Sequence, residues 1–97
     1  MAVTDKQKRY LKGLAHSLKP VVMVGNSGLT ESVVAEINNA LEHHELIKVR
    51  ISGQERAERK AMLDEIAQTT GADLILVIGN IGGFYRPAKD PSIQLPR

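Results

Sequence analysis

The sequence predicts a single compact α/β domain in which helices pack on a mixed four-stranded sheet. Ninety-seven residues suffice for one hydrophobic core but not for two. Segments with helical spacing of apolar residues alternate with short β-prone runs, in the order helix, strand, helix, strand, helix, strand, strand. Strands joined through helices need right-handed crossovers, which favours a sandwich of two or three layers.

A first helix is predicted over residues 5–17. Thr4 and Gln7 have the spacing of a capping box, in which each side chain accepts a hydrogen bond from a backbone N–H of the other residue. The apolar residues that follow share one face, and they are Leu11, Leu14, Ala15 and Leu18. A second stripe, along the helix and its exit, consists of Lys8, Lys12, His16 and Lys19. One face of this helix is therefore expected to be apolar and another basic.

Pro20 ends this helix, and Val21–Val24 is expected to form a short buried strand. The second helix is predicted from Glu31 to about His43, with Thr30 as its N-cap. Strict alternation over residues 46–51 then predicts another strand. Its core-facing residues are Ile47, Val49 and Ile51, and its opposite face carries Leu46, Lys48 and Arg50.

A third helix is predicted over Gln54–Thr70 and ends at Gly71, which is a common C-terminal stop. Leu74–Ile78 is apolar without alternation, and this pattern is typical of a central strand covered on both faces.

After a turn at Gly79–Gly83, residues 84–86 are expected to pair as a short final strand. The domain is assigned to residues 1–87. Residues 88–97, with two of the four prolines, are expected to form an extended tail.

Charge is distributed unevenly along the chain. The formal net charge is only +2, but residues 1–30 hold five basic side chains and one acidic side chain. An anionic partner is therefore expected to meet the amino-terminal third. No run reaches the ~18 apolar residues that a membrane span needs, so the protein is expected to be soluble and unprocessed, with no membrane partner. The absence of cysteine fits a reducing compartment, and the protein is expected to be cytoplasmic.

The sequence contains no residue pattern that is typical of a catalytic site or a metal site. The chain has no cysteine, which excludes thiolate catalysis and cysteine-bound zinc. The run Glu42–Glu45 contains two histidines, but neighbouring side chains on a helix diverge by about 100°, so a solvated helix end is expected there and not a metal site. The paired acids of residues 55–65 alternate with basic residues, which favours a salt-bridged outer face. We therefore expect no enzyme activity, no cofactor and no small-molecule substrate.

Two segments remain as candidate sites. The loop Gly25-Asn26-Ser27-Gly28 joins a strand to a helix amino terminus, where glycines let a backbone approach a phosphate closely, although the same glycines also suit an ordinary turn. Gly79–Gly82 is better explained as a hairpin turn. Tyr85 is able to stack on an unpaired base and Arg86 to bind a phosphate, but both fit ordinary packing equally well.

Taken together, three segments resemble the CRM domain family, named for chloroplast RNA splicing and ribosome maturation, and in particular its stand-alone bacterial YhbY-type form. They are residues 12–22 (KGLAHSLKPVV), 24–30 (VGNSGLT) and 85–87 (YRP). The resemblance extends over nearly the whole chain up to Pro87. It implies a fold akin to the carboxy-terminal domain of translation initiation factor three, RNA binding, and association with precursors of the large ribosomal subunit.

The resemblance also implies which residues bind RNA. The family's Gly-x-x-Gly loop falls on Gly25, Asn26, Ser27 and Gly28, and its basic surface falls on Lys12, Lys19, Lys48 and Arg50. Lys8, His16, Tyr85 and Arg86 complete the predicted set. Many relatives have a lysine where this chain has Asn26, so the loop is expected to orient RNA through amide groups more than through charge.

The resulting hypothesis is a monomeric RNA-binding protein that recognises folded ribosomal RNA through phosphates and shape and assists assembly of the large subunit. Helix-one lysines and the glycine loop are expected to form one continuous surface. A protein-protein adaptor whose basic helix face meets an acidic partner is the alternative. A small phosphate-binding enzyme would require a deep pocket beside Gly25.

Overall fold

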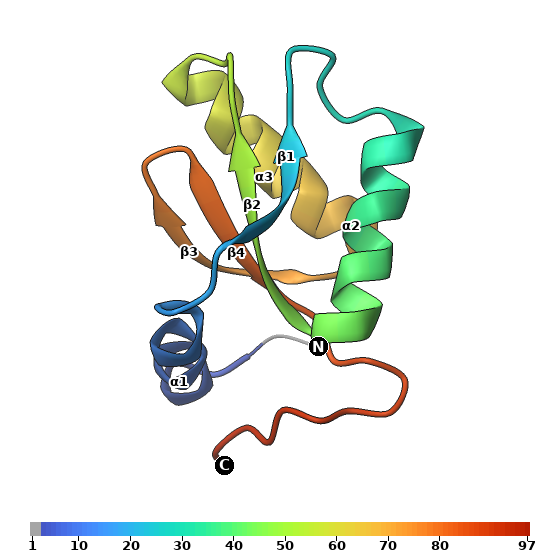
Figure 1. The fold of residues 1–97 in the computed structure, drawn as a ribbon. Helices are drawn as coiled ribbons and strands as arrows, with labels where there is room; N and C mark the ends of the chain where they lie inside the picture. Colours follow the sequence, from blue (N-terminus) through green and yellow to red (C-terminus); the bar gives the residue numbers. More distant parts are fainter. Residues whose placement is uncertain (1–2) are drawn as a thin grey trace.

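The computed structural model describes residues 3–97 and confirms the predicted order of elements (Figure 1). The first two residues of the predicted domain lie outside the described residues. The elements are α1 (Asp5–Ala15), β1 (Pro20–Val24), α2 (Glu31–His44), β2 (Leu46–Ile51), α3 (Arg56–Thr70), β3 (Asp73–Ile78) and β4 (Ile81–Tyr85).

The local signals for helix ends agree with the structure. Thr4 and Gln7 form the predicted capping box, and Thr30 Oγ1 accepts the N–H of Val33 at the start of α2. Gly71 ends α3 in the left-handed conformation, with φ +74°. Helix α1 is two residues shorter than the predicted range, because it ends at Ala15.

The sheet is mixed and four-stranded, in the order β1-β2-β4-β3. Strand β1 runs parallel to β2, and β4 is antiparallel to both β2 and β3. The prediction that β3 is central was wrong: β4 returns from the hairpin between β2 and β3, and β3 lies at the edge. Gly82 and Gly83 allow this, because the side chains of Leu63 and Leu76 occupy the space that side chains at those positions would need.

Helices cover both faces of the sheet, which makes three layers. On one face α2 and α3 enclose a core that includes Ile37, Leu41, Ile47, Leu63 and Phe84. On the other face α1 packs against one end of the sheet through a smaller cluster that consists of Leu11, Ala15, Leu46, Ile75 and Tyr85. Figure 1 shows α1 at the end of the sheet opposite the loop that follows β1.

Strand β1 is also an edge strand, so the expectation that it is buried holds for one face only. Val22 and Val24 are buried toward α2, whereas Val21 and Met23 are 48% and 59% exposed. An apolar run therefore did not distinguish a covered strand from an edge strand with one open face.

The tail after β4 is extended but packs against the domain. Ile93 and Leu95 contact the α1 cluster, and the Gln7 side chain donates a hydrogen bond to the Pro96 carbonyl. Within residues 3–97, no helix combines the length and the apolar character that crossing a membrane requires.

Candidate nucleic-acid interface

The loop Gly25–Gly28 protrudes between β1 and α2 (Figure 1). Gly28 N–H donates to the Gly25 carbonyl at 3.0 Å, which closes a tight turn, and Gly28 has φ +74°. The fold requires glycine at only one of these two positions. Gly28 needs the left-handed conformation, whereas Gly25 has no positive φ and the space where its side chain would project is open. The fold alone therefore does not require glycine at position 25.

The side chain of Asn26 lies against the neighbouring loop. Its side-chain oxygen occupies the space above Gly53, in the turn between β2 and α3. In that turn Ser52 donates both its N–H and its hydroxyl to the Val24 carbonyl, at 2.9 and 3.4 Å. The two loops at the carboxyl ends of β1 and β2 thus contact each other, and the side chain of Asn26 is part of this contact.

The amino terminus of α2 beside the loop is only partly available to an anion. Thr30 already satisfies one of its N–H groups, and Glu31 places a negative charge in the first turn. The glycine loop, and not the helix end, is therefore the better candidate for contact with a phosphate chain.

The basic side chains of α1 lie away from the loop. Lys12, His16 and Lys19 are exposed and Lys8 is partly buried, but α1 sits at the opposite end of the sheet. The expected direct continuity between helix and loop is not present. Instead the outer face of β1 separates them.

Lys19 and Arg50 connect these two ends. They line one surface depression together with Val21 and Met23, and Arg50 pairs with Met23 across the β1–β2 ladder. Met23 is two residues before Gly25. A path of exposed side chains therefore runs from the exit of α1 along β1 to the loop.

Lys48 does not belong to this exposed path. It is only 9% exposed, and its Nζ donates to the Leu18 carbonyl at 3.0 Å. The alternation along β2 correctly predicted that Lys48 lies on the face opposite the main core. However, the segment that follows α1 covers that position.

Tyr85 is likewise buried, at 5% exposure, in the cluster beneath α1. Burial raises the pKa of its phenol, and the carboxylates of Glu45 and Asp73 add to this shift. A side chain in this position offers no face for stacking on a base.

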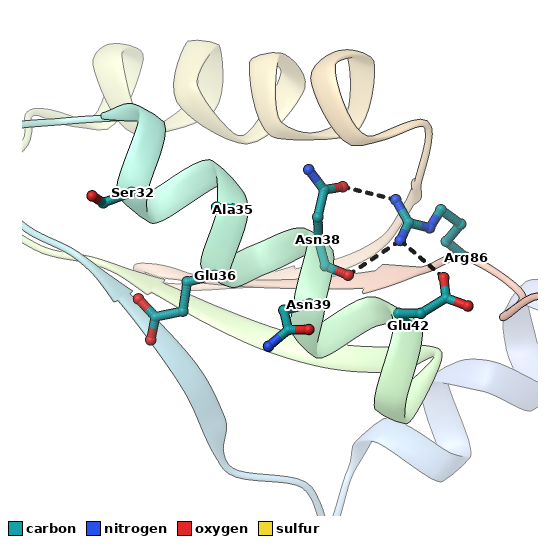
Figure 2. Close-up of a pocket in the computed structure, with 7 residues that line it drawn as sticks. All are labelled: Ser32, Ala35, Glu36, Asn38, Asn39, Glu42 and Arg86. Carbon is teal, nitrogen blue, oxygen red and sulfur yellow. Dashed lines mark hydrogen bonds and ion pairs between the residues drawn. The ribbon is translucent and has the colours of Figure 1, made fainter.

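Arg86 is held within the fold. Its guanidinium donates to the Asn38 side chain at 2.8 Å and to the Asn38 carbonyl at 3.2 Å (Figure 2). It also donates to the Thr70 carbonyl at 2.8 Å. Glu42 forms an ion pair with it at 3.6 Å. Its hydrogen-bonding capacity is therefore largely used in joining α2, α3 and the end of β4, and the predicted phosphate contact has no support in its position.

The sequence interpretation missed Glu45, which it placed at a solvated helix end. Glu45 is 1% exposed and its carboxylate accepts hydrogen bonds from Ala88, Ser92 and Ile93. Its φ of +66° is the only positive value among the non-glycine residues described. The one available signal was the position of Glu45 between the predicted second helix and the strand predicted from residue 46, where glycine is the residue that commonly ends a helix.

A second feature was missed on α3. Of its basic side chains, only Lys60 forms an ion pair with a carboxylate in the described chain, at 3.5 Å to Asp64. Arg56, Arg59 and Lys60 line a groove against Val77 of β3. The expected salt-bridged face is thus mostly a basic groove wall. Among the described residues, no cluster of His, Asp and Glu has the arrangement of a metal site.

The chain is similar to one protein family and to relatives that are named as RNA-binding proteins. A family model described as the CRS1/YhbY (CRM) domain matches residues 3–86. A Haemophilus influenzae protein named as an RNA-binding protein is 52% identical over 95 residues, which cover 98% of this chain and 96% of the relative. A Bacillus subtilis protein named as a probable RNA-binding protein is 33% identical over 95 residues, with 97% and 99% covered.

One solved structure is also similar throughout. The solution structure of a hypothetical Staphylococcus aureus protein, provisionally described as RNA-binding, superposes with a TM-score of 0.85 at 35% identity. The superposition covers 98% of this chain and 100% of that one.

Proposed function

Because the chain belongs to the CRS1/YhbY (CRM) domain family, we propose that it is an RNA-binding protein that binds structured ribosomal RNA in the bacterial cytoplasm. In this proposal it acts as a monomer on precursors of the large ribosomal subunit, as an assembly factor that binds and does not catalyse. RNA binding is supported by the names of relatives that match nearly the full chain. The ribosomal role is inferred from the resemblance to the family, which implies association with precursors of the large subunit.

The observation that carries the proposal is the open space at Gly25 beside exposed cations. A phosphate-sugar chain is able to approach the backbone at Gly25, and Arg50 lies on the neighbouring strand, paired with Met23. Lys19, and farther away Lys12, extend the positive surface toward α1. Such contacts recognise the shape and charge of folded RNA.

Sedimentation of a cell extract on a sucrose gradient, with and without ribonuclease, tests the proposal. The protein is expected to migrate with large-subunit precursors and to return to the top of the gradient after ribonuclease treatment. Complexes that survive ribonuclease would instead support the adaptor with an acidic protein partner. Purified protein that binds no ribosomal RNA in a titration would overturn the proposal itself.

A further inference from the structure

One half of a sheet face carries a row of side chains across all four strands, exposed on β1, β2 and β3 and half-buried at Ile81 of β4. Strand pairing aligns Met23 of β1 with Arg50 of β2, Arg50 with Ile81 of β4, and Ile81 with Ile78 of β3. This is the face on which α1 packs, but the row lies at the end of the sheet nearest the glycine loop, away from α1 (Figure 1). Met23 is 59% exposed and Ile78 is 62% exposed.

The row is apolar with a positive centre. Arg50 is exposed between Met23 and Ile81, and Lys19 lines the adjoining depression. The single acidic residue in the four strands is Asp73, and its pairing with Tyr85 places it at the α1 end of the sheet. A ligand on this row therefore meets apolar surface and positive charge side by side.

A surface that combines apolar side chains with positive charge suits unpaired RNA better than paired RNA. Paired RNA presents phosphates and 2′-hydroxyls, and the flat faces of its bases are hidden by stacking. An unpaired nucleotide combines an exposed base face with a phosphate. Aliphatic side chains and the thioether of methionine pack favourably on aromatic rings, and arginine binds phosphate or stacks on a base.

We propose that the row Met23, Arg50, Ile81 and Ile78 is a binding site for unpaired nucleotides of the RNA ligand. Neighbouring strands are ~4.8 Å apart, so the row spans roughly 14 Å, enough for about two bases. The bases pack on Met23 and Ile78, Arg50 holds the intervening phosphate, and the loop from Gly25 contacts the adjoining backbone. This site rests on the proposed RNA-binding function and specifies the form of RNA that the protein prefers.

The test compares three RNA probes: a hairpin with a pyrimidine loop, a blunt duplex with the same stem, and single-stranded oligouridine. Ile78→Ser and Met23→Ser remove exposed apolar surface from the row. Val77→Ser is the matched control, because Val77 is 53% exposed on the same strand but lines the groove beside α3 on the other face.

Each row variant is expected to bind the hairpin and oligouridine about fivefold more weakly, with unchanged affinity for the duplex. Val77→Ser is expected to bind all three like the unmodified protein. Arg50→Ala should reduce the slope of log affinity against log salt for the hairpin by about 0.7 to 0.9.

The possible failures are distinguishable. If the unmodified protein binds none of the probes and no ribosomal RNA, the proposed function fails. If it binds RNA but prefers the duplex, or if Ile78→Ser and Val77→Ser behave alike, only the unpaired-nucleotide site is overturned. Loss of a copurifying protein in Ile78→Ser, with all RNA affinities intact, would also overturn it.

Discussion

The Glu45 carboxylate accepts a hydrogen bond from the Ile93 N–H at 2.8 Å, across 48 positions of the chain. The N–H and hydroxyl of Ser92 donate to the same oxygen, at 2.9 and 2.8 Å, and Ala88 N–H donates to the other at 2.8 Å. One buried carboxylate thus fastens a tail that has no helix or strand, and the tail in turn packs its apolar residues against α1.

Replacement of Glu45 by glutamine is expected to lower the free energy of unfolding by roughly 2 kcal/mol, because charge-assisted hydrogen bonds to a buried group are lost. Urea denaturation followed by circular dichroism measures this change. Glu42→Gln is the control, since Glu42 lies near the same helix end but is exposed, accepts one hydrogen bond, from Lys89 N–H, and forms a 3.6 Å ion pair with Arg86 at its half-exposed carboxylate. Equal stability of the two variants would contradict the role assigned to Glu45.

The same group predicts a pH dependence. Burial alone would raise the pKa of Glu45, but hydrogen bonds from Ala88, Ile93 and Ser92 outweigh burial and lower it from 4.5 to about 2. Because the folded-state pKa is depressed, the stabilisation is complete above the unfolded-state value and is lost as the pH falls from about 4.5 toward 2. Urea midpoints measured over this range should fall more steeply for the natural protein than for Glu45→Gln. Parallel profiles would contradict the prediction.

The two loop glycines should respond differently to substitution. Gly25→Val is expected to leave stability within ~0.5 kcal/mol of the original, because its side chain meets open space, and to weaken RNA binding by obstructing the backbone. Gly28→Ala is expected to cost about 1 kcal/mol, because a φ of +74° strains a residue that has a side chain. Thermal unfolding and RNA titration of both variants measure these effects. Unchanged RNA affinity in folded Gly25→Val would exclude close approach at this position.

Sequence patterns predicted those features that depend on neighbouring residues. The cap at Thr30, the stop at Gly71 and the bounds of β2 follow from local hydrogen bonding and alternation. The order of strands depends on contacts between distant residues, such as Leu63 against Gly82, which periodicity does not encode. The apolar run of β3 was therefore assigned to the wrong place in the sheet.

The candidate site shows the same division. The position of the glycine loop was predictable, because glycines between a strand and a helix cap mark a turn. The burial of Lys48 was not predictable, because the segment that covers it is distant in the sequence. Lys48 Nζ donates a hydrogen bond to the carbonyl of Leu18 in that segment, 30 positions away. Exposure of a charged side chain was assumed from its type, and tertiary packing overrode that assumption.

Lys19 and Lys48 should separate binding from stability. Lys19→Ala is expected to lower the salt slope of RNA binding by about 0.7 to 0.9 with little change in stability, because Lys19 is an exposed cation. Lys48→Met keeps most of the buried stem but loses the hydrogen bond to Leu18, so a loss of about 1 kcal/mol and an unchanged salt slope are expected. Affinities measured over a salt series, together with urea denaturation, provide both quantities. A reduced slope in Lys48→Met would return this residue to the RNA-binding surface.

Arg86 should behave as a structural residue even though it lies in a segment that resembles the family pattern. Arg86→Lys keeps the charge but cannot reproduce donation to Asn38 and Thr70 from a planar guanidinium, so we expect a loss of roughly 2 kcal/mol in unfolding free energy. RNA affinity, measured at a temperature where the variant remains folded, should stay within twofold of the original protein. Because lysine preserves the positive charge, a large drop in affinity at full folding would mean that the guanidinium contacts RNA directly and that its position in the free protein changes on binding.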